Sequence, residues 1–299
     1  PKCMVDLTGG LGVDFSFVAR EFEQAVYVER QENLCQLARH NFKLLGLEHA
    51  QVVCADGVEY LKNMTHGVDL IFLDPARRKT VLIQDCEPDV CALAQTLLSH
   101  ARYVVVKLSP MLDIAAAIQA LGCVHQVHVV GHGGECKDLL LVLKQGAETP
   151  RIFVRETEGS FSFTPHHEAT ATPQFATQVG QYLYEPGAAA MKAGAFKWMG
   201  VHYGLKKLHP NSHLYTTDVE GITSFPGRAF KVEQVLGFSK DDVKQLRNLA
   251  PKANITVRNF PATVDVLRKK LKIKEGGDLF IFATTTADNQ HVMVLCRKK

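Results

Sequence analysis

The stretch that decides the fold is Val5-Asp6-Leu7-Thr8-Gly9-Gly10-Leu11-Gly12-Val13-Asp14, near the start of a chain of 299 residues. It continues a short apolar run, Cys3–Leu7, that predicts a β-strand, and it leads into a stretch, Asp14–Glu23, that predicts a helix. Glycines let the backbone turn tightly and approach a ligand, and the first turn of a helix offers free N–H groups. The stretch therefore predicts a nucleotide-binding loop, a feature that several α/β folds share.

Short apolar runs alternate with amphipathic stretches through about residue 145, which is the pattern of a largely parallel sheet. Only Gly131–Lys137 separates the last two runs, and this gap is too short for a helical crossover, so we expect an antiparallel hairpin there. The prediction is an α/β, Rossmann-like sheet of seven strands with an antiparallel last strand. The expected strands are Cys3–Leu7, Ala25–Val28, Ala50–Cys54, Asp69–Leu73, Arg102–Lys107, Val124–Val130 and Asp138–Lys144. The other expected helices are Asn33–Leu45, Gly57–Met64, Asp89–His100 and Leu112–Leu121.

The composition changes from about Ala147, where Thr, Ser, Pro and His become frequent, and mixed helix and strand signals follow. We therefore expect small α+β modules behind the first domain, with the chain divided into residues 1–146, 147–236 and 237–299. A helical patch is expected near Ala188–Met199. The tail is expected to contain helices at Lys240–Leu249 and Thr263–Leu271 and strands at Asn254–Arg258, Leu279–Thr285 and His291–Arg297.

Acidic residues follow three successive strands of the predicted sheet. Glu29 comes ~20 residues after the glycine loop, where an acid hydrogen-bonds the ribose hydroxyls of an adenosine cofactor. Asp56 follows the third strand, and Asp74 follows the fourth, at the edge where ligands of open α/β sheets bind. A single acid at the end of a strand is explained equally well as the N-cap of the following helix. Three in succession indicate a cofactor site.

Taken together, Asp6, the loop 9–12, Glu29, Asp56 and the pair Asp74-Pro75 resemble class I S-adenosylmethionine-dependent methyltransferases, above all the branch that acts on RNA. The resemblance covers about residues 1–145 and implies S-adenosyl-L-methionine as the cofactor. It implies that Asp6 and the loop hold the methionine end, Glu29 the ribose and Asp56 the adenine. The implied cofactor-binding residues are Asp6, Thr8, Gly9, Gly10, Gly12, Asp14, Glu29, Asp56 and Gly57.

The tail carries a second resemblance. Val257-Arg258-Asn259-Phe260-Pro261 and Leu267-Arg268-Lys269-Lys270-Leu271 are similar to the THUMP-like domain attached to some bacterial methyltransferases of this kind. The preceding module is expected to be the ferredoxin-like piece that these proteins carry.

Two mechanisms remain open for the transfer step. In the first, the Asp74 carboxylate and the Pro75 carbonyl orient the amino group of a base, although Ala76-Arg77 stand where the usual motif has Pro and an aromatic residue. In the second, Asp74, Lys107 and Glu135 resemble the last three members of the Lys-Asp-Lys-Glu tetrad of ribose 2′-O-methyltransferases. The first Lys would then be Lys2 or lie upstream, because the chain opens directly on a strand pattern and we expect a region before it.

The substrate is expected to be RNA, either tRNA or rRNA, with Arg77 and Arg78 contacting its phosphate backbone. The net charge of +3 permits such a partner without requiring it. The alternatives are a small-molecule or protein methyltransferase and a catalytically silent RNA-binding scaffold. A dehydrogenase is disfavoured because the loop lacks the third glycine at its usual spacing.

Composition sets the remaining expectations. Hydrophobic residues make up 46% of the chain, as in ordinary globular proteins, and no apolar run approaches the ~18 residues of a membrane span. The eight cysteines show neither a CxxC pair nor a zinc-like spacing, and the 13 histidines suggest no set of ligands. We therefore expect no metal site and a location in the reducing cytoplasm. The oligomeric state stays open.

Overall fold

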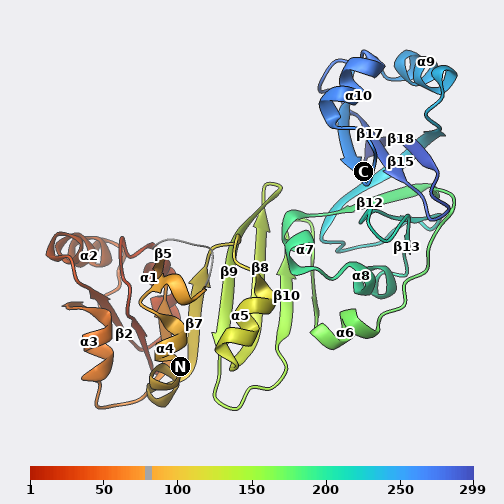
Figure 1. Cartoon of the computed structure of the whole chain (residues 1–299). Helices are drawn as coiled ribbons and strands as arrows, with labels where there is room; N and C mark the ends of the chain where they lie inside the picture. The colour runs from red at the N-terminus through yellow and green to blue at the C-terminus, as the bar shows by residue number, and fades with distance from the viewer. Residues whose placement is uncertain (78–82) are drawn as a thin grey trace. The chain divides into compact units, whose positions relative to one another are not determined.

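A computed structural model describes residues 1–77 and 83–299 (Figure 1). The chain divides into two compact units. The first comprises Pro1–Val130 and Lys137–Phe153, and the second comprises Gly131–Cys136 and Val154–Lys299.

The sheet of the first unit contains all seven expected strands in the order β8-β9-β7-β4-β1-β2-β3. Its strands are β1 (Cys3–Asp6), β2 (Gln24–Glu29), β3 (Ala50–Cys54), β4 (Val68–Leu73), β7 (Ala101–Leu108), β8 (Val124–His132) and β9 (Glu135–Leu143). Strands β3, β2, β1, β4 and β7 are parallel, whereas β9 runs antiparallel to β7. Gly133 and Gly134 both have positive φ in the β8–β9 turn, as a two-residue hairpin turn requires. The predicted fold class is confirmed.

Five α-helices connect these strands: α1 (Val13–Val18), α2 (Glu32–Leu44), α3 (Gly57–Lys62), α4 (Val90–His100) and α5 (Ile114–Leu121). Helix α1 is shorter than expected, because it passes into the 3₁₀ turn η1 (Ala19–Glu21). Asp56, Asp89 and Asp113 are the N-caps of α3, α4 and α5, and each carboxylate accepts a hydrogen bond from the first turn.

Three aromatic rings fix the glycine loop against the sheet. Phe15 of α1, Tyr27 of β2 and Phe42 of α2 are buried, and their ring centroids lie 4.8–5.6 Å apart. Tyr27 packs edge to face against both phenylalanines, whose own rings are tilted by 32°. Aromatic pairs of this kind are worth about 0.5–1.5 kcal/mol each beyond the area buried. The carboxyl ends of β1 and β2 are therefore held rigidly where the candidate site lies.

Some short elements were not expected from the sequence. Strands β5 (Ala76–Arg77) and β6 (Cys86–Glu87) form a small antiparallel ribbon after β4, and the 3₁₀ turn η2 (Ile83–Asp85) precedes β6. Strands β10 (Arg151–Arg155) and β11 (Ser160–Phe163) arise from the Thr- and Ser-rich stretch and add to the edge of the sheet at β8. The boundary between the two units falls within β10.

The second unit is built on a sheet with the order β13-β14-β12-β15-β18-β17-β16. Strand β15 (Gly227–Leu236) pairs with both β12 (Tyr182–Pro186) and β18 (His291–Lys298), so the two small modules share this sheet. The other strands are β13 (Lys206–Lys207), β14 (Tyr215–Thr217), β16 (Asn254–Arg258) and β17 (Leu279–Thr285). The helices are α6 (Pro165–Thr170), α7 (Ala188–Ala193), α8 (Phe196–His202), α9 (Lys240–Leu249) and α10 (Val264–Leu271).

The expected tail elements are all present, α9, β16 and β17 with the expected bounds. Ser239 and Asp242 form a capping box that begins α9, and Thr263 caps α10. Both helices bury leucines, Leu246 and Leu267, in one core with Ile281 of β17. Among the described residues, none of the helices is long and apolar enough to span a membrane.

Candidate functional site

The glycine loop begins at a buried carboxylate. Asp6 ends β1 with 2% of its surface exposed, and its Oδ1 accepts hydrogen bonds from the Thr8 amide (2.9 Å) and the Thr8 hydroxyl (3.3 Å). Burial raises the pKa of Asp6 to about 7, although the two bonds from Thr8 oppose the shift, and the nearby charges of Asp14 and Asp74 add to it. Asp6 therefore titrates near neutral pH, at the carboxyl end of β1, an interior strand of the sheet.

Two glycines of the loop are required by their neighbours. A Cβ on Gly9 would lie 2.3 Å from the ring of Tyr27, so only glycine fits there. Gly12 has a φ of 73° and is the N-cap of α1, a left-handed conformation that glycine adopts without strain. The Tyr27 hydroxyl also donates to the Gly10 carbonyl, which ties the loop to β2.

Glu29 lies beside the loop, at the end of β2. Its Oε2 accepts from the Gly10 amide (3.0 Å) and its Oε1 from the Gln31 amide (2.9 Å), and 9% of the residue is exposed. A carboxylate that accepts backbone N–H bonds from both sides is fixed in position. This is the arrangement that an acid needs in order to recognise a ligand's hydroxyl groups.

Asp56 and Gly57 approach from the end of β3. The Asp56 Oδ1 accepts from the Val58 amide (2.9 Å) and the Glu59 amide (3.1 Å), so the residue is a helix cap as well as a pocket residue. A Cβ on Gly57 would lie 2.1 Å from the Leu7 carbonyl oxygen. The glycine thus allows α3 to begin directly against the end of β1.

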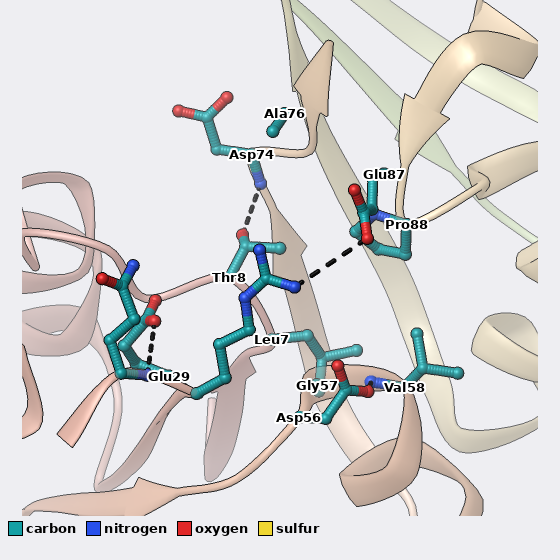
Figure 2. Close-up of a pocket in the computed structure, with 12 residues that line it drawn as sticks. Leu7, Thr8, Glu29, Asp56, Gly57, Val58, Asp74, Ala76, Glu87 and Pro88 are labelled. Carbon is teal, nitrogen blue, oxygen red and sulfur yellow. Dashed lines mark hydrogen bonds and ion pairs between the residues drawn. The ribbon is translucent and has the colours of Figure 1, made fainter. Parts of the chain in front are cut away.

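Of these residues, Glu29, Asp56 and Gly57 line a pocket of 270 Å³ at the carboxyl ends of β1–β4 (Figure 2). Asp6 and the loop 9–12 are not among its lining residues. In the pocket wall the Thr8 hydroxyl accepts from the Asp74 amide (2.7 Å), and Arg30 forms an ion pair with Glu87 (3.8 Å). A pocket of roughly this size holds a small-molecule cofactor. It is lined by Leu7, Thr8, Glu29, Arg30, Gln31, Asp56, Gly57, Val58, Asp74, Ala76, Glu87 and Pro88.

Lys107, at the end of β7, lies among three carboxylates. Its Nζ is 2.7 Å from Asp14, 3.7 Å from Asp74 and 3.9 Å from Asp138. Burial alone would lower the pKa of Lys107, but the hydrogen bond and charge of Asp14 and the charges of the two other acids outweigh it, and the pKa is raised. Lys107 is therefore a permanent cation at physiological pH.

Asp74 belongs to both neighbouring cavities. Burial raises its pKa, and Lys107 opposes this shift. A second cavity of 210 Å³, lined by Asp74, Pro75, Lys107, Lys137 and Asp138 among others, lies on the Lys107 side. Two cavities therefore share Asp74. The first has room for a cofactor, and the second has room for another reactant.

The other residues expected at the site have mixed placements. Glu135 is an exposed residue that begins β9. The residue of β9 whose carboxylate lies near Lys107 is Asp138, three residues further along the strand. Arg77 ends β5, and Arg78 lies outside the described residues. The backbone amide of Lys2 bonds Asp69 at the amino end of β4, so Lys2 lies at the opposite end of the sheet from Asp74.

Sequence reasoning missed Tyr27 and Asp138. Tyr27 reads as an ordinary core residue of an apolar strand, and nothing in the sequence shows that its hydroxyl holds the loop. The antiparallel pairing of Lys107 with Leu140 brings the β9 segment containing Asp138 to the end of β7. That register is visible only in the folded sheet.

Comparison with known proteins decides the family. Residues 1–130 match the family model described as "conserved hypothetical protein 95", residues 182–226 a ferredoxin-like domain, and residues 227–298 a THUMP domain-like family. The crystal structure of a "putative methyltransferase" from Porphyromonas gingivalis W83 is 39% identical, with a TM-score of 0.90 over 99% of this chain and 77% of that protein. The chain belongs to this family of S-adenosylmethionine-dependent methyltransferases.

Curated relatives agree with this assignment. An uncharacterized S-adenosylmethionine-dependent methyltransferase of Mycobacterium tuberculosis is 24% identical over 289 residues, which are 93% of this methyltransferase and 76% of the relative. An uncharacterized RNA methyltransferase of Clostridium tetani is 26% identical over 125 residues, 37% of this chain and 27% of that protein. The resemblance inferred from the motifs is confirmed: this is an enzyme, and its cofactor is S-adenosyl-L-methionine.

Proposed function

We propose that this methyltransferase modifies RNA, tRNA or rRNA, and that the acceptor is an amino nitrogen of a base. The observation that carries the choice of acceptor is the position of Lys107, whose Nζ lies 2.7 Å from Asp14, 3.7 Å from Asp74 and 3.9 Å from Asp138, because three carboxylates favour the protonated ammonium. A general base must be able to take up a proton near neutral pH. A lysine that stays protonated cannot do so for a ribose hydroxyl, whereas an amino group needs only acceptors that orient it.

The pocket fits the cofactor on two grounds. First, a side chain at Gly57 would collide with the Leu7 carbonyl, so the backbone of residue 57 lines the pocket without a side chain. Second, the Glu29 carboxylate is fixed by two backbone amides. In our proposal Asp6, Thr8 and the loop 9–12 hold the methionine end, Glu29 holds the ribose, and Asp56 with Gly57 holds the adenine. The bound cofactor supplies an electrophilic methyl group on a sulfonium.

The task of the protein is then alignment. Asp74 lines both cavities and the buried Pro75 lines the second. In our proposal the Asp74 carboxylate and the Pro75 carbonyl accept hydrogen bonds from an amino group and point its lone pair at the methyl. Holding two reactants in the reactive geometry lowers the activation barrier without any chemical group having to act as a base. Lys107 fixes the Asp74 side chain by charge and is a positioning residue in this scheme.

The RNA part of the proposal draws support from the rest of the chain. The match to a THUMP domain-like family and the RNA methyltransferase of Clostridium tetani are consistent with it. Arg77, Arg78 and the net charge of +3 suit contacts to phosphates. A cytoplasmic location belongs to the same proposal, and among the described residues no cysteine is in a disulfide.

The test is methylation of total bacterial RNA with S-adenosyl-[methyl-³H]methionine, followed by digestion to nucleosides and mass spectrometry. Label on a base amino group, absent with Asp74→Ala, is the expected result. Label on ribose would overturn the acceptor and favour the alternative that uses Asp74, Lys107 and Glu135. Label only on protein or small molecules would overturn the RNA substrate. Cofactor binding with no turnover on any of these would indicate a silent scaffold.

A further inference from the structure

A second cluster of side chains with ligand chemistry lies behind the cofactor pocket. It consists of Glu32, Cys35 and Cys54, and one carboxylate oxygen and the two Sγ atoms all lie within 4.8 Å of one another. Cys35 is buried, while Glu32 and Cys54 are exposed. Nothing in the proposed transfer reaction uses these three residues.

The fold brings the three together from two elements. Glu32 and Cys35 are three residues apart in the first turn of α2, so they lie on the same face of the helix. Cys54 ends β3, in register with Glu29 at the end of β2, from which the chain turns into α2. The 18 residues between Cys35 and Cys54 conceal this convergence, which is why their spacing predicted no site.

The distances suit a small soft cation. Zinc binds thiolate sulfur at about 2.3 Å and carboxylate oxygen at about 2.0–2.2 Å, so ligand atoms around a tetrahedral ion lie about 3.5–3.8 Å apart. The three ligand atoms already lie within 4.8 Å of one another, which exceeds such spacing by about 1 Å at most. Two sulfurs and one oxygen leave a fourth position for water, on the exposed side of Cys54.

The present partners of the three groups are compatible with an ion. The Cys35 thiol donates to the Glu29 carbonyl (3.2 Å), and the Cys54 thiol lies 3.8 Å from the Arg30 carbonyl. Glu32 accepts from Arg39 (3.1 Å) and Gln36 (3.3 Å), both at Oε1. The Cys54 thiol also forms hydrogen bonds with the Glu32 side chain and with Cys35, so the three groups already converge on one another.

We propose that Glu32, Cys35 and Cys54 form a binding site for a soft divalent cation of the zinc class. On binding, each thiol releases its proton to solvent, two metal–sulfur bonds and one metal–oxygen bond form, and no electron is transferred. The site carries a net charge of −3 when deprotonated, which a divalent ion offsets in large part. The ion would join the first turn of α2 to the end of β3.

The proposal is tested by titrating the reduced, metal-free chain with Cd²⁺ and following thiolate-to-cadmium charge-transfer absorption, with Zn²⁺ then added as competitor. The expected result is one Cd²⁺ per chain, displaced by Zn²⁺. Cys54→Ser, at an exposed position, is expected to weaken binding by at least about 10-fold and to halve the band or abolish it. Glu32→Gln is expected to weaken it less.

Cys3→Ala is the matched control, since Cys3 is a half-buried cysteine beside Asp69 and outside the cluster. It should bind Cd²⁺ like the unchanged chain. Zn²⁺ should also raise the melting temperature of the unchanged chain and of Cys3→Ala, but not that of Cys54→Ser. No charge-transfer band, or a band and affinity in Cys54→Ser equal to those of the unchanged chain, would overturn the proposal.

Discussion

The pKa of Asp6, raised to about 7 mainly by burial, predicts how cofactor affinity depends on pH. If Asp6 holds the ammonium group of the cofactor's methionine end, that cation stabilises the ionised carboxylate. Binding then requires the ionised form, so the affinity must rise as the pH rises through the pKa of the free enzyme. Below that pKa the carboxyl is neutral, and the cofactor must first displace a proton.

The magnitude follows from the titration curve. With a pKa of about 7, roughly 1% of Asp6 is ionised at pH 5 and roughly 50% at pH 7. The dissociation constant of S-adenosylhomocysteine should therefore fall by about 50-fold between these two values. Measurements stay at or below pH 7 because α-amino groups begin to lose their proton near pH 8.

The assay is titration calorimetry of the unchanged chain, Asp6→Asn and Asp74→Asn at several pH values. Asp6→Asn should bind the ligand about 1–3 kcal/mol more weakly at pH 7 and show almost no pH dependence. Asp74→Asn controls for the other nearby carboxyl group whose pKa is raised, and it should keep the slope. A flat profile in the unchanged chain, or the same slope in Asp6→Asn, would refute the role of Asp6.

Three further substitutions test other parts of the structure. Gly57→Ala places a Cβ against the Leu7 carbonyl, so it should lower the free energy of unfolding by about 1–3 kcal/mol and weaken cofactor binding. If denaturant unfolding shows the variant to be as stable as the unchanged chain, the close approach is contradicted. Asp74→Ala should abolish transfer in the tritium assay and leave calorimetric cofactor binding largely intact, and a fully active variant removes Asp74 from the mechanism. Leu246→Ala empties a fully buried position in the core under α9 and should cost about 2–5 kcal/mol in urea unfolding; a cost below about 1 kcal/mol would show that the site collapses around the smaller side chain.

Elements with strong local signals were predicted well. Helix α9 has a capping box at Ser239 and Asp242, and its apolar residues recur at helical spacing, so its bounds follow from the sequence. Strands β10 and β11 were missed because Thr, Ser, Pro and His around them are typical of loops. These strands form because they extend an existing sheet edge. Pairing between segments that are distant in sequence is only weakly predictable from the local residue types.

The sequence by itself predicted which residues meet at the carboxyl edge of the sheet. The glycine loop, Glu29, Asp56 and Asp74 stand at or just after the ends of successive parallel strands, and parallel strands place their carboxyl ends at one edge, so chain order alone places these residues at that edge. Only the tertiary structure decided which acid reaches Lys107, because Asp138 comes there through the antiparallel register of β9. The same holds for Glu32, Cys35 and Cys54, which converge across a helix and a strand. Contacts between elements depend on register and packing, and neither is encoded in the spacing of residues along the chain.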